Sequence, residues 1–123
     1  MPHVTVEVRT RYTPEDEIRL LEEVHEALRE TFDVAAGARC ERLIAHEPHR
    51  FTCPASKPHP EKWTVVTIES FPGRSTDSKR ALYKRLVARL QSFGIPPDHV
   101  AIVLHELPRE NWGLRGGLAA CDF

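Results

Sequence analysis

The chain contains one strand-like pattern twice, as LIAHE at residues 43–47 and as IVLHE at residues 102–106. The two copies lie 59 positions apart, with their His-Glu pairs in register. Repetition at a fixed distance indicates that one supersecondary unit occurs twice in the chain. The residues that precede each copy show what this unit is.

A predicted strand and a predicted helix precede the first copy. Apolar and polar residues alternate over residues 3–9, as in a strand with one buried face. Thr13 and Pro14 are typical of an N-cap and a first helical position, so we expect a helix over residues 14–32 that ends in a turn containing Gly37. Its apolar stripe, with spacings of three and four, is Ile18, Leu21, Val24, Leu28 and Phe32.

A predicted strand and a predicted helix also precede the second copy. A strand is predicted over residues 63–68, and Ser75 or Thr76 is the expected cap of a second helix that ends at Gly94. The apolar stripe of this helix is Leu82, Leu86, Leu90 and Phe93. A strand over residues 100–104 completes the unit, so each half of the chain is predicted to be a β-α-β unit.

These units define the predicted organisation of a single α/β domain. The repeats are expected over residues 1–47 and 61–107, with a proline-rich linker over 48–60 and a glycine-rich C-terminal turn over 108–123. Because β-α-β crossovers are right-handed, both helices should cover the same face of a four-stranded sheet.

The other face of this sheet has no cover within the chain. Either Val65 or Val66, and either Ile102 or Val103, must point toward it, because strand residues alternate between faces. An uncovered apolar sheet face predicts an oligomer that buries it.

Composition excludes several classes of partner. The 123 residues have a formal net charge of −1 and a pI near 6.7, so long-range attraction to nucleic acid or anionic lipid is not expected. The sequence lacks an apolar run of about 20 residues and an N-terminal export pattern, and its three cysteines suit a reducing compartment. We therefore expect a cytoplasmic protein without a membrane partner.

Histidines and a cysteine gather between the two halves, at His46, His49, Cys53 and His59. A zinc site needs three or four ligands on rigid elements, and this stretch is rich in proline without a second ligand pair at matching spacing. No metal and no other cofactor is predicted.

The N-terminus offers a candidate catalytic group, because Pro2 follows Met1 directly. If Met1 is removed, Pro2 has a secondary amine, and apolar surroundings with nearby cations would lower the pKa of that amine toward neutrality. Such an amine can transfer protons. The structural alternative is that Pro2 only begins an edge strand.

Two motifs in the second half indicate a family. They are FPGRS at residues 71–75, followed by Lys79, and PRENWGLRGG at residues 108–117. Together with Pro2 and the doubled β-α-β unit, they resemble the tautomerase superfamily, in particular the subgroup that contains malonate semialdehyde decarboxylase. The resemblance implies a homotrimer with an N-terminal proline in a pocket between subunits.

The resemblance also implies roles for individual residues. Pro2 matches the catalytic proline, and Arg74 matches an arginine that binds the substrate carboxylate. Arg42 falls where 4-oxalocrotonate tautomerase has a substrate-binding arginine, and Trp112 matches an aromatic residue of the pocket wall. Arg11, in the corresponding turn of the first half, is an alternative carboxylate ligand.

The chain departs from related patterns at several positions. Phe71 stands where the decarboxylase has a second arginine, and residues 38–40 lack its acidic residue. Val103 and Leu114 replace the glutamate and tyrosine with which chloroacrylate dehalogenases activate water. Hydrolytic dehalogenation is therefore not expected.

Three functions follow from these observations. The first is keto-enol tautomerisation of a small 2-oxo or 3-oxo carboxylic acid, with Pro2 transferring the proton and Arg74 binding the carboxylate. The second is decarboxylation with hydration as a side activity, in which Pro2 acts as a cation. The third is a non-catalytic trimer with a binding or structural role, which retention of Met1 would favour because Pro2 would then be an amide.

Overall fold

The central sheet contains both predicted repeats. The computed structural model describes residues 2–9 and 11–123. The strands are β1 (His3–Val8), β2 (Glu41–Ala45), β3 (Thr64–Ser70) and β4 (Val100–Glu106). They form a mixed sheet of order β2-β1-β3-β4, in which β1 is parallel to β2, β3 is parallel to β4, and β1 is antiparallel to β3. The prediction of two β-α-β units in one four-stranded sheet is confirmed.

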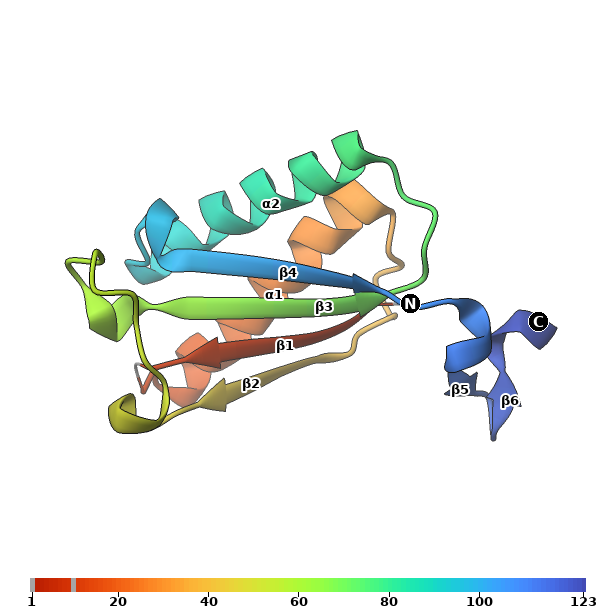
Figure 1. Cartoon of the computed structure of the whole chain (residues 1–123), viewed down its shortest axis with the longest axis horizontal. Helices are drawn as coiled ribbons and strands as arrows, with labels where there is room; N and C mark the ends of the chain where they lie inside the picture. Colours follow the sequence, from red (N-terminus) through yellow and green to blue (C-terminus); the bar gives the residue numbers. More distant parts are fainter. Residues whose placement is uncertain (1, 10) are drawn as a thin grey trace.

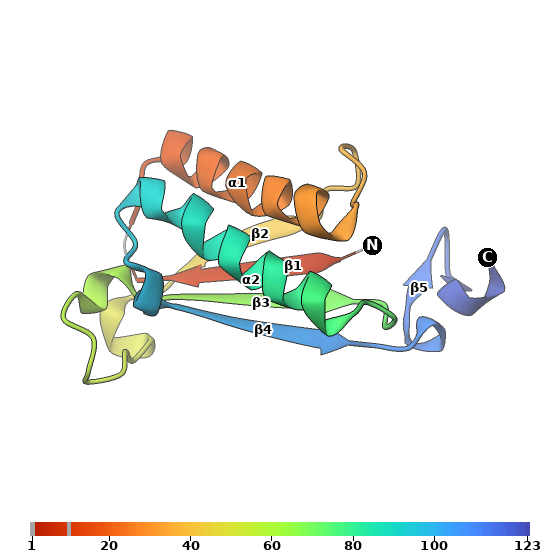
Figure 2. The same cartoon turned by 90° about the horizontal axis from the view of Figure 1, so that it is seen from above.

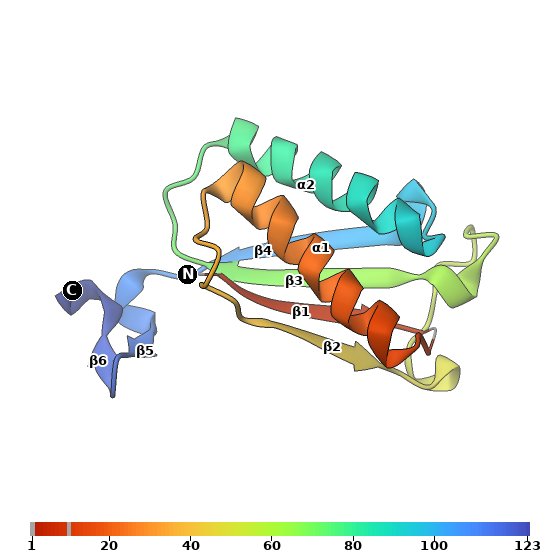
Figure 3. The ribbon, with the colours of Figure 1, turned by 180° about the vertical axis from the view of Figure 1, so that it is seen from behind.

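The two helices are α1 (Pro14–Phe32) and α2 (Thr76–Leu90), and both lie on the same face of the sheet (Figures 1 and 2). Both helices begin directly after a predicted N-cap residue. The side-chain oxygens of Thr13 and Ser75 accept hydrogen bonds from backbone N–H groups three residues later, at 3.2 Å and 3.1 Å. Seen from the helix side, α1 and α2 run next to each other over the sheet (Figure 3).

The core lies between the helices and the sheet. Its fully buried side chains include Val4, Val6, Val8, Leu20, Val24, Leu28, Phe32, Val66, Ile68, Leu82, Leu86 and Leu90. The predicted stripe of α1 was wrong at one position, because Ile18 is 61% exposed and Leu20 contributes to the core instead. Gly37 does not end the helix either. The C-cap is Asp33, with φ 52°, and Gly37 lies in a later turn.

The sheet face away from the helices, called the open face below, has no cover within the described residues, as seen in Figure 1, where α1 lies behind the strands. Val66 points into the core, and Ile102 packs against it, so Val65 and Val103 belong to the open face. Val103 is 43% exposed and Ile44 is 42% exposed. Large apolar side chains are therefore available on this face for contact with another chain.

The segment between β2 and β3 contains short 3-10 helices at Pro48–Arg50 and Pro60–Lys62. Arg9 donates hydrogen bonds to the carbonyl oxygens of Pro60 and Pro48, at 2.9 Å and 3.3 Å. The backbone N–H of His59 donates to Nε2 of His99 at 3.2 Å. These bonds attach the segment to the end of the sheet that lies opposite Pro2.

After β4, the chain forms a small arm at the end of the sheet where β1 begins (Figure 1). It contains a 3-10 turn (Arg109–Asn111), the hairpin β5 (Gly113–Leu114) and β6 (Leu118–Ala119), and a final 3-10 turn (Ala120–Asp122). No helix in the described part of the chain combines the length and apolar composition that a bilayer crossing requires.

Candidate active site

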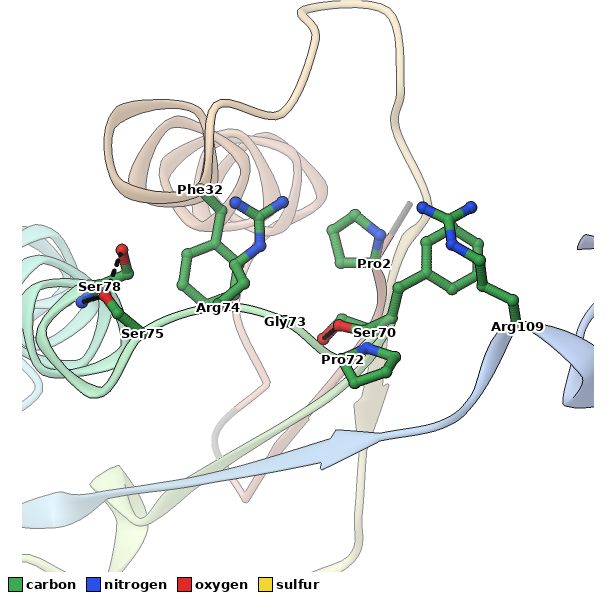
Figure 4. A pocket seen from close by; sticks show the side chains of 10 residues that line it. Pro2, Phe32, Ser70, Pro72, Gly73, Arg74, Ser75, Ser78 and Arg109 are labelled. Carbon is green, nitrogen blue, oxygen red and sulfur yellow. Dashed lines mark hydrogen bonds between the residues drawn. The ribbon is translucent and has the colours of Figure 1, made fainter. Parts of the chain in front are cut away.

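A cavity of about 380 Å³ opens at the end of the sheet where β1 begins and β3 ends (Figure 4). Its volume lies within the range of about 300–1,000 Å³ that is typical of small-molecule sites. Among the described residues, its lining contains no Asp or Glu. The lining consists of Pro2, Phe32, Ser70, Phe71, Pro72, Gly73, Arg74, Ser75, Ser78 and Arg109.

Pro2 is buried and lies directly before β1. Because β1 is antiparallel to β3, with His3 opposite Glu69, the residue before β1 reaches the end of β3. β1 lies between two other strands, so the structural alternative of a proline at the start of an edge strand does not apply. Met1, whose removal the catalytic hypothesis requires, lies outside the described residues.

Arg74 lies in the loop between β3 and α2, immediately after Gly73. Gly73 has φ 118°, a value that residues with a Cβ atom rarely adopt, so glycine allows the loop to turn here. The guanidinium carbon of Arg74 lies 4.3 Å from the ring centroid of Phe32, at the end of α1. Stacking occupies one face of the guanidinium and leaves its in-plane N–H groups free for an anion.

Arg109 lines the cavity from the 3-10 turn after β4. Its guanidinium carbon lies 4.2 Å from the ring centroid of Phe71. The sequence analysis did not name Arg109 as a site residue, although it stands within the motif at 108–117. In Figure 4, Pro2 lies between the guanidinium groups of Arg74 and Arg109.

Trp112 contacts a residue of the cavity lining and is not itself part of the lining. Its ring contacts Phe71 edge-on at 5.3 Å and His3 edge-on at 5.2 Å between ring centroids. The side chain is 8% exposed, and its indole N–H donates to the carbonyl oxygen of Leu107 at 3.2 Å. Trp112 therefore fixes the position of Phe71, which forms the wall.

The other two predicted arginines lie elsewhere in the chain. Arg11 follows β1 at the opposite end of the sheet, where it forms an ion pair with Glu47. Arg42 is exposed on β2 opposite Thr5, and strand alternation places it on the open face. Within one chain, neither arginine lines the cavity with Pro2.

The histidines lie outside the lining of this cavity. His25 is buried, with Nε2 3.0 Å from the carbonyl oxygen of Ala36 and Nδ1 3.3 Å from Oε1 of the buried Glu41. His46 lies 2.9 Å from a carboxylate oxygen of Glu7. Among residues 2–9 and 11–123, no three His, Cys, Asp or Glu side chains are placed to bind a metal ion.

Two carboxyl groups with perturbed pKa values are also outside the cavity lining. Hydrogen bonds from Arg85, which has the larger effect, and from Arg89 lower the pKa of Glu30. Glu30 lies on α1 and both arginines lie on α2, so these ion pairs link the two helices. A hydrogen bond from His99 lowers the pKa of Asp98, beside the segment between β2 and β3. Both shifts come from structural ion pairs or hydrogen bonds.

A family model described as "Tautomerase enzyme" matches residues 38–115, which is more than half of the chain. The chain belongs to this tautomerase family. The matched region includes Arg74, Arg109 and Trp112. Among curated proteins, 2-hydroxymuconate tautomerase from Comamonas testosteroni is 36% identical to this chain over 45 residues, which cover 36% of this chain and 71% of that protein.

Solved structures of tautomerase-like proteins share the whole fold. A structure of malonate semialdehyde decarboxylase, described with decarboxylase and hydratase activities, is 25% identical with a TM-score of 0.84, covering 95% of this chain and 93% of that chain. A fused 4-OT, described as an asymmetric trimer, is 19% identical with a TM-score of 0.86, covering 98% and 97%. The latter similarity shows the fold alone.

Proposed function

We propose that this tautomerase-family chain interconverts the keto and enol forms of a small 2-oxo or 3-oxo carboxylic acid. One observation carries the proposal: Pro2 and Arg74, from opposite halves of the chain, line the same cavity. A proton-transfer group and a carboxylate-binding group are the two components that this reaction needs. Family membership supports the reaction class.

Pro2 is the proposed proton-transfer residue after removal of Met1. In the enol-to-keto direction, the amine accepts the proton of the enol hydroxyl, and the resulting ammonium group donates a proton to the carbon atom next to the one that becomes the carbonyl. Nearby cations disfavour protonation of the free amine, which keeps part of it available as a base. A positioned proton-transfer group typically contributes about 10²–10⁴-fold to the rate.

Arg74 is the proposed carboxylate ligand. Its guanidinium is stacked on Phe32, so its orientation is restricted before substrate binds. A charge-assisted hydrogen bond to a carboxylate contributes about 1.5–3 kcal/mol. Holding the carboxylate at Arg74 places the adjacent oxo or enol group toward Pro2 in the same cavity.

A homotrimer is part of the proposal. The exposed Ile44 and Val103 on the open face favour burial against other chains, and the similar fused 4-OT structure is described as a trimer. Sedimentation at micromolar concentration should give a species of three chains, whereas a stable monomer would contradict this assembly.

A cytoplasmic location is also proposed, since Cys40, Cys53 and Cys121 are all free thiols.

Decarboxylation of a 3-oxo acid is the second candidate. It is favoured by the 25% identity to malonate semialdehyde decarboxylase over nearly the whole chain. In this reaction a protonated Pro2 would stabilise the negative charge that develops when carbon dioxide leaves. The third candidate, a non-catalytic trimer, applies if Pro2 remains an amide.

One experiment separates these candidates. Intact-mass measurement first establishes the N-terminus, and the purified protein is then assayed with the enol of phenylpyruvate, with 2-hydroxymuconate and with malonate semialdehyde. We expect enol–keto conversion of the first or second compound. Carbon dioxide release from malonate semialdehyde alone would select decarboxylation, and inactivity of Met1-free protein on all three would contradict both enzymatic proposals.

A further inference from the structure

Two arginines without carboxylate partners share the Pro2 cavity. Arg74 comes from the loop before α2, and Arg109 comes from the turn after β4. Within the described residues, neither guanidinium lies within ion-pair distance of an Asp or Glu, whereas Arg19, for example, pairs with Asp16 at 2.8 Å. The cavity therefore holds two positive charges with no acidic lining residue to compensate them, in a chain whose net charge is −1.

Local packing restricts Arg109. Its guanidinium stacks on Phe71, and Phe71 contacts the buried Trp112. The turn is closed by backbone hydrogen bonds from Asn111 to Pro108 at 2.9 Å and from Trp112 to Arg109 at 3.2 Å. The positive charge is thus held at the cavity by a packed aromatic unit, which reduces the entropy lost when it binds an anion.

We propose that Arg109 is a second anion-binding residue of the Pro2 cavity and makes the enzyme prefer substrates with two carboxylates. This inference rests on the proposed function. An oxo dicarboxylic acid or its enol would place one carboxylate at Arg74 and the other at Arg109. The carbon atoms between the carboxylates then lie beside Pro2, which Figure 4 shows between the two guanidinium groups.

A charge comparison supports this assignment. A monocarboxylate neutralises only one of the two guanidinium groups, whereas a dicarboxylate neutralises both. Stacking on Phe71 leaves the in-plane N–H groups of Arg109 available for a bidentate contact with a carboxylate. Arg109 should therefore affect the choice between mono- and dicarboxylates more than it affects the proton transfer itself.

Ligand binding tests Arg109 independently of turnover. Glutarate and pentanoate have the same number of carbon atoms but differ by one carboxylate, and their dissociation constants can be measured by calorimetry for the native protein, R109Q, R109K and R115Q. We expect R109Q to weaken glutarate binding by about ten- to a hundred-fold and to leave pentanoate binding unchanged. R109K should retain part of the glutarate affinity.

R115Q is the matched control. Arg115 also stacks on an aromatic ring, that of Phe123, in the same C-terminal arm, but it does not line the Pro2 cavity. R115Q should bind both compounds like the native protein. Equal losses of glutarate and pentanoate binding in R109Q, or no loss of either, would overturn the proposal.

Activity assays on the same proteins use the enol of oxaloacetate, a dicarboxylate, and the enol of phenylpyruvate, a monocarboxylate. R109Q should lower kcat/KM for oxaloacetate by about ten- to a hundred-fold more than it lowers kcat/KM for phenylpyruvate. If the native protein converts neither enol but binds glutarate through Arg109, the proposed function fails while the assignment of Arg109 stands.

Discussion

The two ends of the β1–β3 strand pair have similar architecture, but their arginines have different partners. A loop connects a central strand to a capped helix at each end, and each end has cationic side chains. At the far end, Arg11 pairs with Glu47, and Lys62 donates to the carbonyl oxygen of Phe93 at 3.1 Å. At the Pro2 end, Arg74 and Arg109 lie over aromatic rings, and neither pairs with a carboxylate of the described residues.

This difference is the basis for proposing one site in a repeated fold. Duplication of a β-α-β unit produces two equivalent corners, each formed by the end of a central strand and the start of the helix that follows it. The fold does not require that the cationic side chains at either corner have partners within the chain. Cations paired with carboxylates stabilise the corner itself, and cations without carboxylates can bind a ligand. Pro2, the proposed proton-transfer residue, lies at the end with these arginines.

The largest expected effect comes from changing the proline. Pro2→Ala should reduce kcat/KM by about 10²–10⁴-fold, because a primary amine replaces the secondary amine and the ring no longer fixes the direction of the nitrogen. Val4, Val6 and Val8 hold β1 in the core, so circular dichroism should show a folded protein. A folded variant with full activity, or an unfolded one, would remove Pro2 from the catalytic role.

The next effect compares the arginines of the two corners. Arg74→Ala should lower kcat/KM for carboxylic acids by about ten- to a hundred-fold, because one charge-assisted hydrogen bond to the carboxylate is lost. Arg11→Ala, at the far corner, should leave the kinetics nearly unchanged. If Arg11→Ala has the larger effect in steady-state assays, the carboxylate site must lie at the other end of the sheet.

The smallest effect compares the two tryptophans. Trp112→Ala removes edge contacts to His3 and Phe71, and an aromatic pair contributes about 0.5–1.5 kcal/mol, so activity should fall by up to about tenfold while the oligomer remains folded. Trp63 precedes β3 at the far end, and Trp63→Ala is the matched control. Unchanged kinetics for Trp112→Ala would show that Trp112 only packs.

Much of the fold could be predicted because local signals agree with the tertiary structure. The alternating valines of β1, the caps at Thr13 and Ser75, and the duplicated pattern ending in His46-Glu47 each specify one element or its repetition. Ile18 was assigned to the core incorrectly because a spacing of three or four residues fits two neighbouring stripes on one helix. Only packing against the sheet selects Leu20 over Ile18.

The candidate site could be predicted only in part. Pro2 and Arg74 stand in recognisable sequence contexts, and the fold brings them to one cavity. Arg109 has a weaker context, because its position at the cavity depends on stacking with Phe71, 38 positions earlier in the chain. The usable signal was its place in the 108–117 motif, beside Trp112. For Arg42, the role assigned by resemblance stays a prediction that depends on contact between chains.

The central claim, catalysis by the N-terminal amine of Pro2, is tested most directly by changing only the state of that nitrogen. Protein that retains Met1 is produced in cells whose methionine aminopeptidase is inhibited. Purified methionine aminopeptidase is then added to remove Met1 in stages. Intact mass gives the processed fraction, and an enol–keto assay gives the rate. We predict that the rate rises in proportion to the fraction with free Pro2. Full activity of the unprocessed protein would contradict the claim.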